Sequence, residues 1–308
     1  MKQRVEAWAA ALVGGIIRLL PRWVALGLGG LLGRALAAAD RRHVAIAVDN
    51  LRHAFPDWEP ARSEATARAV YAHFGRVLLD ILWLQWRSRE ELLALVDVRG
   101  REHVDAAMAA GRGVVLCAAH IGNWEVHGIA HGLLFGAIDV VARPLDNPAL
   151  DARLCAFRAM GGNSVVYKKK ALARVLGAMR SGRGVAILLD QNVQAKDGIF
   201  VDFFGRPAAT TTVAAALASK TGCALVPSHT ELRPDGRYAL VYEPPLVWTT
   251  RGDRETDLAW ITQELAHRAE AWIRETPEQW LWMHRRWKTR PQQAELGDPQ
   301  AAGPESRK

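Results

Sequence analysis

The stretches AAGRGVVLCAAH (residues 109–120) and RSGRGVAILLDQ (residues 180–191) decide the fold. Each runs from the end of an expected helix through a glycine turn into an apolar strand that finishes in polar residues. From about residue 100, other short apolar runs alternate with helical segments in the same way: DVVA, SVVY, CALVPS and YALVY. This alternation predicts an α/β fold in which helices flank a largely parallel central sheet.

The polar ends of these two stretches indicate where the functional site lies. His120 ends the first stretch, and Asp190 and Gln191 end the second. In open α/β sheets, ligands bind beyond the carboxyl ends of the strands. We therefore expect His120, Asp190 and Gln191 at or near the site.

Composition narrows the class of partner. The 308 residues are 50% hydrophobic and 23% charged and carry a formal net charge of +8, which favours an acidic partner such as nucleic acid, an anionic membrane surface or an acidic carrier protein. The basic residues are scattered and no nucleic-acid-binding motif occurs, so no nucleic-acid partner is expected. Cys117, Cys155 and Cys223 are widely spaced. They indicate neither a disulfide framework nor a thiolate metal site, and they fit a reducing, cytoplasmic-side environment.

The N-terminal segment is the most apolar part of the chain. Arg18, Pro21 and Arg22 interrupt residues 7–39 near the middle, so an unbroken span of about 20 apolar residues is missing. Apolar helices that associate with a membrane are expected here rather than a cleaved signal peptide, with ordinary core helices as the alternative. Arginines near these helices suit anionic headgroups on the cytoplasmic side.

Residues 118–128, AAHIGNWEVHG, carry the candidate chemistry. His120 and Glu125 are five residues apart, about 140° on one helix, so they can meet only if the helix begins between them. Gly122 permits a turn, Asn123 is a good helix cap, and Glu125 falls in the first turn. Glu125 can then orient the imidazole of His120, leaving the other ring nitrogen as a general base. The alternative is a capping motif whose histidine only packs on the sheet.

Two competing chemistries are weaker. His127 and His131 are four residues apart and can join His120 as ligands of zinc in a hydrolase, but no carboxylate or cysteine is spaced to complete that site, so we expect no metal. No GxSxG nucleophile motif occurs, and Cys117 lies within an apolar strand. A lone base is sufficient when a substrate hydroxyl attacks an activated thioester.

The stretch HIGNWE (residues 120–125) resembles the His-x4-acidic motif of glycerolipid acyltransferases. Its form, His-x4-Glu, is that of the bacterial lipid A late acyltransferases. The resemblance extends over about residues 20–291 and includes these further blocks in order: DNLRHAFP (49–56), ARPLDNPALDARLCAFRAMGG (142–162), LLDQN (188–192), GIFVDFFGRPAATTT (198–212) and PEQWLWMHRRWKTRP (277–291). It implies a glycerolipid acyltransferase-like fold on the cytoplasmic side of the inner membrane.

The resemblance also implies a reaction. A fatty acyl chain, lauroyl or myristoyl in the family, passes from acyl carrier protein to a hydroxyl of a lipid A precursor, with no cofactor beyond the acyl donor. Acyl-coenzyme A is the alternative donor. His120 is the expected base and Glu125 its orienting partner, and no acyl-enzyme forms.

If the chain carries out this reaction, other residues have candidate roles in it. Substrate contacts are expected from Asn123, Arg143, Arg158, Asp190 and Gln191. The two arginines can bind phosphates of the disaccharide or pair with nearby aspartates. Arg158 or the backbone N–H groups around Gly122 and Asn123 can stabilise the oxyanion. Lys168–Lys170 can receive the carrier protein or begin a solvated helix. The FVDFFG run can line an acyl groove or be core. WLWMHRRW can form an interface belt, a phosphate contact or a structural cap.

The predicted organisation is a membrane-associating helical segment (residues 1–45), an acyltransferase domain (46–291) and a disordered tail (292–308). Alternatives within acyl transfer are a phosphatidylinositol-mannoside-type or another glycolipid acyltransferase, which resemble the same family. The zinc hydrolase and a non-catalytic membrane-surface protein are alternatives of other classes.

Overall fold

The computed structural model describes residues 2–167 and 171–291. Two expectations lie outside the described residues: the carrier-protein contact at Lys168–Lys170 and the disordered tail at 292–308.

A seven-stranded sheet forms the centre of the molecule, in the spatial order β1-β9-β8-β2-β5-β3-β4. Its strands are β1 (Val96–Arg99), β2 (Val114–Ala118), β3 (Ile138–Ala142), β4 (Ser164–Tyr167), β5 (Gly184–Leu188), β8 (Ala224–Leu232) and β9 (Tyr238–Tyr242). The five strands β8, β2, β5, β3 and β4 run in one direction, and β9 and β1 run in the other. The prediction of a largely parallel sheet is confirmed.

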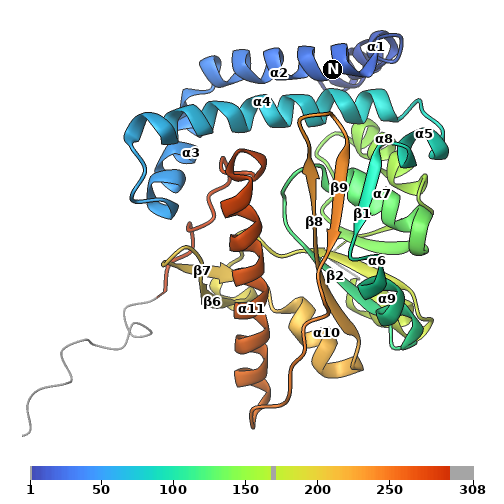
Figure 1. Ribbon diagram of the computed structural model, residues 1–308, viewed down its shortest axis with the longest axis vertical. Coiled ribbons are helices and arrows are strands. Elements are labelled where there is room, and N and C mark those ends of the chain that lie inside the picture. Colours follow the sequence, from blue (N-terminus) through green and yellow to red (C-terminus); the bar gives the residue numbers. More distant parts are fainter. Residues whose placement is uncertain (1, 168–170, 292–308) are drawn as a thin grey trace, which may run out of the picture.

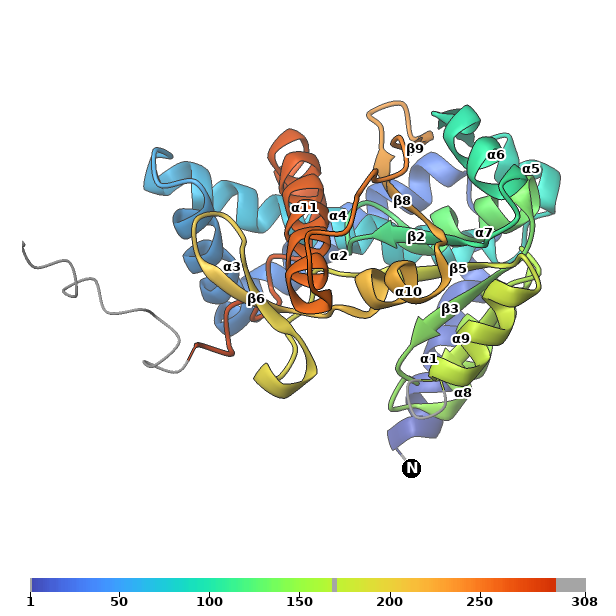
Figure 2. The same ribbon diagram turned by 90° about the horizontal axis from the view of Figure 1, so that it is seen from below.

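Helices cover both faces of the sheet (Figure 1, Figure 2). They are α6 (Arg101–Ala109), α7 (Trp124–Phe135), α8 (Pro148–Ala159), α9 (Ala171–Arg180), α10 (Val213–Thr221) and α11 (Arg254–Glu275). Along β2, Val114 and Leu116 pack with side chains of α6, α7 and α8, whereas Val115 and Cys117 pack with α9, α10 and α11. Both faces are therefore buried, which explains why the strand reads as a continuous apolar run.

Five helices precede or flank this sheet: α1 (Lys2–Ile17), α2 (Arg22–Ala39), α3 (Arg41–Ala54), α4 (Pro60–Leu84) and α5 (Arg89–Leu93). Figure 1 shows α2 lying along α4. Glycines allow the close approach: a Cβ on Gly33 would lie 2.0 Å from the carbonyl oxygen of Tyr71, and one on Gly75 would lie 2.1 Å from that of Gly29. Helix α2 thus packs backbone to backbone against α4, and the domain boundary at residue 45 stays a prediction.

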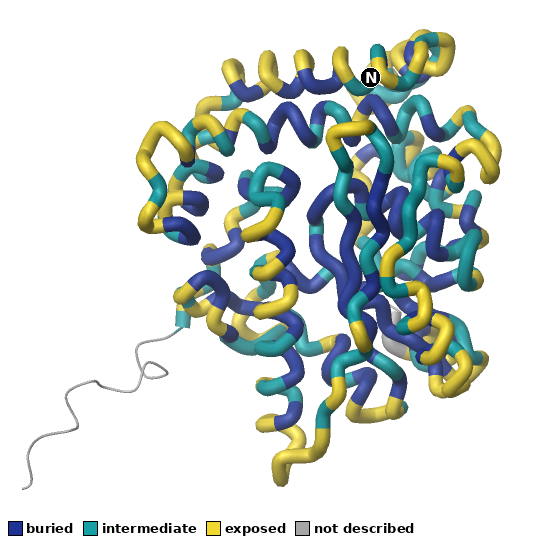
Figure 3. Tube along the Cα trace, viewed as in Figure 1, coloured by how far each residue is buried: buried dark blue, intermediate teal, exposed yellow. Residues whose placement is uncertain are grey.

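The outer surface of α1 and α2 is exposed (Figure 3), and many of its side chains are large and apolar. Its exposed large side chains are Val5, Trp8, Leu12, Val13, Ile16, Trp23, Leu28, Leu31, Leu32 and Leu36, and Leu19 is exposed in the turn between the two helices. Among the described residues, no single helix has the length and apolarity to cross a membrane, while α2 and α3 together pass that test as a pair bent by 96°.

A small hairpin and a C-terminal segment complete the fold. Strands β6 (Ile199–Asp202) and β7 (Pro207–Thr210) pair antiparallel, and the short helix η2 (Ala195–Asp197) precedes them. After α11, the short helix η3 (Pro277–Gln279) leads into residues 280–291, where Trp280 forms an antiparallel bridge with Ile121. The C-terminal segment therefore lies against the turn that follows β2.

Candidate active site

His120 lies beside Asp190 because β2 and β5 are neighbouring parallel strands. Their register pairs Ala118 with Leu188, and the N–H of Leu189 continues the ladder to the carbonyl of Ala118 at 2.9 Å. Two residues further on, His120 Nδ1 lies 2.8 Å from Asp190 Oδ1, and the backbone N–H of His120 donates to Oδ2 at 2.8 Å. Asp190 therefore holds both the ring and the backbone of His120.

The carboxylate of Asp190 is buried and surrounded by donors. Trp280 Nε1 donates to its Oδ2 at 2.6 Å, in addition to the two contacts from His120. Burial raises the pKa of Asp190, but the charge of His120 and the hydrogen bonds from His120 and Trp280 outweigh it and lower the pKa to about 2. Asp190 is thus a carboxylate that only accepts hydrogen bonds at neutral pH.

The second ring nitrogen of His120 faces an exposed group. An ionised Asp190 requires the proton of a neutral imidazole on Nδ1, so Nε2 carries the free lone pair. Gln191 Nε2 lies 3.2 Å from this nitrogen and donates to it. The ring of Trp124 stands edge-on to the imidazole, with centroids 5.0 Å apart. His120 is therefore oriented by Asp190 and presents a base toward Gln191, which confirms that His120, Asp190 and Gln191 lie together.

The helix cap expected between His120 and Glu125 is confirmed. Helix α7 begins at Trp124, and the side-chain oxygen of Asn123 accepts from the N–H of Val126 at 3.2 Å. Gly122 must be glycine here: its φ is +59°, and a Cβ would lie 1.9 Å from the carbonyl oxygen of Thr230. Glu125 falls in the first helical turn, as predicted.

The predicted pairing of His120 with Glu125 is wrong. Glu125 is buried and receives Arg158 in a bidentate pair, Nε to Oε2 at 2.7 Å and Nη2 to Oε1 at 2.6 Å. Trp124 Nε1 also donates to Glu125 at 3.2 Å. Sequence spacing considered only the partner within the motif, whereas the sheet register supplies Asp190 and α8 supplies Arg158.

Three of the expected substrate contacts have protein partners in the structure. Asn123 is fully buried, and its side-chain amide nitrogen donates to Tyr238 at 2.9 Å while its oxygen caps α7, so it does not face a substrate. Arg158 is held by Glu125 rather than by an aspartate. Arg143 lies on the surface beside Asp146 at 3.1 Å, which is the carboxylate pairing that the sequence left open.

Backbone donors are available at the start of α7. The N–H of Gly122 is used, because it donates to the carbonyl of Gln279 at 3.0 Å. The first-turn N–H groups of Trp124 and Glu125 have no acceptor within residues 2–167 and 171–291, as is usual for the first turn of a helix. These two N–H groups, next to His120, replace Gly122 as the candidate oxyanion donors.

The zinc site of the alternative hydrolase does not form. His131 Nδ1 contacts the hydroxyl of Tyr242 at 3.1 Å, and His127 is buried beside the same ring, while His120 is bound to Asp190. No three His, Cys, Asp or Glu side chains in the described part of the chain converge as metal ligands would. His127 and His131 are core residues of α7.

These two buried histidines make the fold sensitive to acid. Burial, with the charges of His131 and His229, lowers the pKa of His127 to about 3, and burial lowers the pKa of His131 to about 3. In the unfolded chain, both histidines bind protons at the ordinary histidine pKa of about 6.5. The stability that these two neutral histidines contribute is therefore fully present above about pH 6.5 and is lost as the pH falls toward 3.

We expect His127→Leu to flatten this dependence. Between pH 6 and pH 4, each such histidine costs about 1.4 kcal/mol of unfolding free energy per pH unit. The variant should lose about that much slope in urea unfolding measured at several pH values. A slope equal to that of the parent protein would contradict the buried, neutral state of His127.

The C-terminal aromatic segment is core, not an interface belt. Trp280, Trp282 and Trp287 are buried and join a cluster that includes Phe203 and Phe204 of the FVDFFG run. These phenylalanines are therefore core residues. Phe203 also lines a small cavity behind Asp190, together with alanines of α10 and α11.

Polar groups of the same segment fix the loop that carries Asp190 and Gln191. His284 Nε2 accepts from the N–H of Asn192 at 2.9 Å, and burial lowers the pKa of His284 to about 4. Arg286 is buried and donates to the carbonyls of Ala209 at 2.8 Å and Gln191 at 3.4 Å. Sequence reasoning missed these contacts, because nothing in WLWMHRRW indicates that it packs behind a loop about 90 residues away.

Comparison with known proteins shows the family of the chain. The sequence profile of the family described as "Bacterial lipid A biosynthesis acyltransferase" matches residues 1–289. The lipid A biosynthesis lauroyltransferase of Escherichia coli (strain K12) is 30% identical over 289 residues, which cover 92% of each chain. The phosphatidylinositol mannoside acyltransferase of Mycobacterium tuberculosis (strain CDC 1551 / Oshkosh) is 30% identical over 220 residues, 70% of this chain and 67% of that one. The chain therefore belongs to the bacterial lipid A biosynthesis acyltransferase family and is an acyltransferase.

Proposed function

We propose that the protein transfers a fatty acyl chain from an acyl carrier protein thioester directly to a hydroxyl of a lipid A precursor, with His120 as the general base. The single observation that carries this mechanism is the geometry of His120: Nδ1 is held by the buried Asp190, and Nε2 is free to accept a proton beside the exposed Gln191. The amide of Gln191 occupies the position that a substrate hydroxyl would take.

The reaction needs no cofactor, because the thioester is already activated. His120 Nε2 removes the proton of the acceptor hydroxyl as its oxygen bonds to the thioester carbonyl carbon. Asp190 stabilises the imidazolium that forms. The tetrahedral intermediate then collapses, the carbon–sulfur bond breaks, and the leaving thiolate takes the proton from Nε2. The product ester and the free thiol leave with the enzyme unchanged.

The oxyanion of the intermediate requires hydrogen-bond donors. The first-turn N–H groups of Trp124 and Glu125 lie at the positive end of α7 next to His120 and suit this role. Gln191 can add a side-chain donor once the acceptor hydroxyl has displaced it from His120. The surface position of Arg143 leaves it available to a phosphate of the acceptor.

Mass spectrometry of lipid A tests the proposed function. A strain that lacks the protein should lose one secondary acyl chain, the wild-type chain should restore it, and His120→Ala should not. Unchanged lipid A in the deletion strain would refute lipid A as the acceptor, whereas restoration by His120→Ala would refute the catalytic base.

A second acceptor is favoured by the comparisons. The chain is 30% identical to a protein named for acylation of a phosphatidylinositol mannoside. The same base and thioester chemistry would serve that acceptor. Purified protein assayed with each acceptor lipid separately would decide between them, since only the true acceptor should support turnover.

We also propose that the protein attaches to the cytoplasmic side of the inner membrane through α1 and α2. Trp8 and Trp23 are each 76% exposed and Leu19 is 75% exposed, and such residues insert at the boundary between headgroups and acyl chains. The arginines Arg4 and Arg34 are exposed on the same two helices and suit anionic headgroups.

Trp23→Ser is expected to weaken binding to anionic lipid vesicles about tenfold, which corresponds to about 1.4 kcal/mol of lost apolar insertion. Vesicle co-sedimentation measures the change. Val247→Ser is the matched control, because Val247 is an exposed apolar residue on a loop outside these helices. Equal binding by the two variants would contradict attachment through this surface.

A further inference from the structure

A buried chain of hydrogen bonds connects α2 with the N-terminal cap of α7, the helix that begins beside His120. Arg22 of α2 pairs with Asp80 of α4, Nε to Oδ1 at 2.8 Å and Nη2 to Oδ2 at 2.7 Å. The hydroxyl of Tyr238 on β9 donates to Asp80 Oδ2, and Asn123 Nδ2 donates to the same hydroxyl at 2.9 Å. The last contact of the chain is the cap itself, from Val126 N–H to Asn123 Oδ1.

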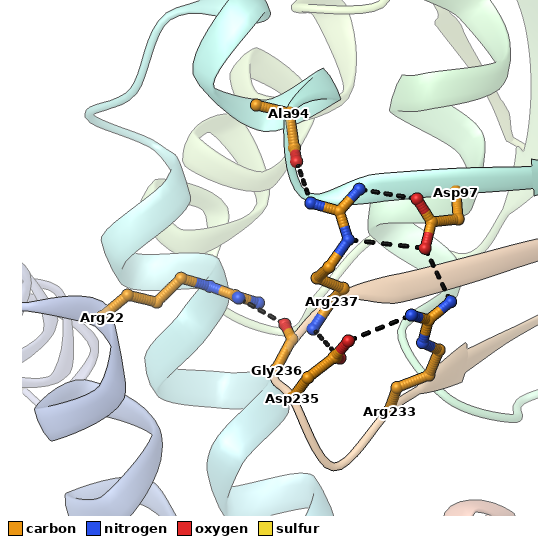
Figure 4. A network of polar contacts seen from close by, with 7 residues as sticks. All are labelled: Arg22, Ala94, Asp97, Arg233, Asp235, Gly236 and Arg237. Carbon is orange, nitrogen blue, oxygen red and sulfur yellow. Dashed lines mark hydrogen bonds and ion pairs between the residues drawn. The ribbon is translucent and has the colours of Figure 1, made fainter.

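Arg22 also joins this chain to the β8–β9 hairpin. Figure 4 shows its guanidinium donating to the carbonyl of Gly236, next to the bonds of Arg237 with Ala94 and Asp97. Asp80, Tyr238 and Asn123 are all fully buried. Burial, and then the charge of Asp80, raises the pKa of Tyr238 far above its ordinary value, so its hydroxyl keeps its proton.

The direction of each bond in the chain is fixed by Asp80. A carboxylate only accepts, so the hydroxyl of Tyr238 must donate to it and can only accept from Asn123. The amide nitrogen of Asn123 therefore points to Tyr238, and its oxygen must point to Val126, which is the orientation that caps α7. An ion pair between α2 and α4 thus determines how an asparagine in the active-site turn is rotated.

We propose that Asp80, held in place by Arg22, is a positioning residue for acyl transfer: it fixes the rotation of Asn123 and through it the start of α7. That start carries Trp124, which contacts His120, and the two free N–H groups proposed for the oxyanion. The role in acyl transfer rests on the proposed function. Helix α2, for which the sequence predicted membrane association with a core helix as the alternative, then also supports the active site.

Removal of the ion pair tests this role. In Arg22→Met/Asp80→Leu no buried charge is left unpaired, and replacing a buried pair by apolar side chains is often neutral for stability. The hydroxyl of Tyr238 then loses its acceptor at Asp80 and competes with the N–H of Val126 for the side-chain oxygen of Asn123, so the amide is no longer held in one orientation and the cap is weakened. We expect kcat to fall about tenfold or more with KM for the acyl donor changed less than about twofold, because misplaced catalytic groups affect the reaction step.

Adding Tyr238→Phe to this double variant should restore kcat to within about threefold of the parent. The competing hydroxyl is gone, so the oxygen of Asn123 returns to Val126. A merely structural role predicts the opposite, since the third change removes one more buried hydrogen bond. Arg237→Met/Asp97→Leu is the control, because it deletes a more exposed Arg–Asp pair at the same hairpin (Figure 4). In the described part of the chain, the other side-chain contacts of this pair go to Ala94 and Arg233 rather than to the active-site turn.

Hydrogen exchange of the Val126 amide gives a readout that does not require activity. Exchange should be faster in Arg22→Met/Asp80→Leu and return toward the parent rate once Tyr238→Phe is added. A parent protein without acyl-transfer activity would refute the proposed function alone, and the exchange rates would still decide the role of Asp80. Equal kcat and exchange in the ion-pair and control variants, or no recovery with Tyr238→Phe, would overturn the inference.

Discussion

Asp190→Asn is expected to lower kcat about 10⁴-fold and to change KM little, which is the size of effect seen when the carboxylate of a Ser-His-Asp triad becomes an amide. The three donors around Asp190 explain why. Its Oδ2 accepts two N–H groups, from the His120 backbone and from Trp280, whereas Oδ1 accepts one, from His120 Nδ1. The oxygen of an asparagine would take the position with two donors, so its NH2 group would face Nδ1.

The consequence is a change of tautomer at His120. Facing an NH2 group, Nδ1 must accept, and the proton of the neutral ring moves to Nε2, where the base is needed. Steady-state kinetics on the purified protein would measure the loss. Asp139→Asn is a suitable control, because Asp139 is a buried carboxylate on the neighbouring strand β3 that pairs with Arg174 and Arg183 instead. An Asp190→Asn protein that kept a tenth of the parent kcat would contradict the orienting role.

The architecture could be predicted from the sequence, and so could the meeting of three candidate site residues, because both follow from local patterns. Short β-branched runs bounded by glycine turns favour strands, and neighbouring parallel strands place their carboxyl ends at one edge of the sheet. His120, Asp190 and Gln191 therefore came together as expected. The position of the cap at Asn123 was predictable for the same reason, since a helix that begins between His120 and Glu125 needs a capping residue there. The contacts of Asn123 with Tyr238 and, through it, with Asp80 were not predictable from this stretch.

The partner of His120 could not be predicted, because it depends on the register between two strands. The stretches 109–120 and 180–191 align His120 with Gln191 when their glycine turns are superposed. The observed register pairs Ala118 with Leu188 and so shifts the match by one residue, to Asp190. Backbone pairing across about 70 residues of chain sets that shift, and no local spacing contains it.

The tryptophans show a second limit of composition. Trp23 and Trp280 belong to the same residue type, but Trp23 is 76% exposed and Trp280 is 1% exposed and bonded to Asp190. An amphipathic ring with one donor suits either environment. Trp280 is buried because the C-terminal segment packs against the turn after β2, and the residue type alone does not predict that packing.

The pair of Glu125 and Arg158 gives the second large effect, this time on stability. Glu125→Met leaves the guanidinium of Arg158 without its carboxylate in a site where the two side chains are only 8% and 13% exposed. Breaking a pair of this kind costs about 3 kcal/mol of unfolding free energy. The double variant Glu125→Met/Arg158→Met should recover most of that loss, since no unpaired charge remains. Urea unfolding of the parent, the single and the double variants completes the cycle.

Activity of the same double variant separates the two interpretations of the His-x4-Glu motif. If Glu125 supports the fold through Arg158, as its contacts indicate, the double variant should have a kcat within about tenfold of the parent value. Its stability is restored, and His120 keeps its hydrogen bond to Asp190. If Glu125 instead orients His120, restored stability cannot restore the base, and kcat should stay as low as in Asp190→Asn. A stable but inactive double variant would therefore return the orienting role to Glu125. We expect a stable and active one, because both oxygens of Glu125 are bound by Arg158 and the Nδ1 of His120 is bound by Asp190.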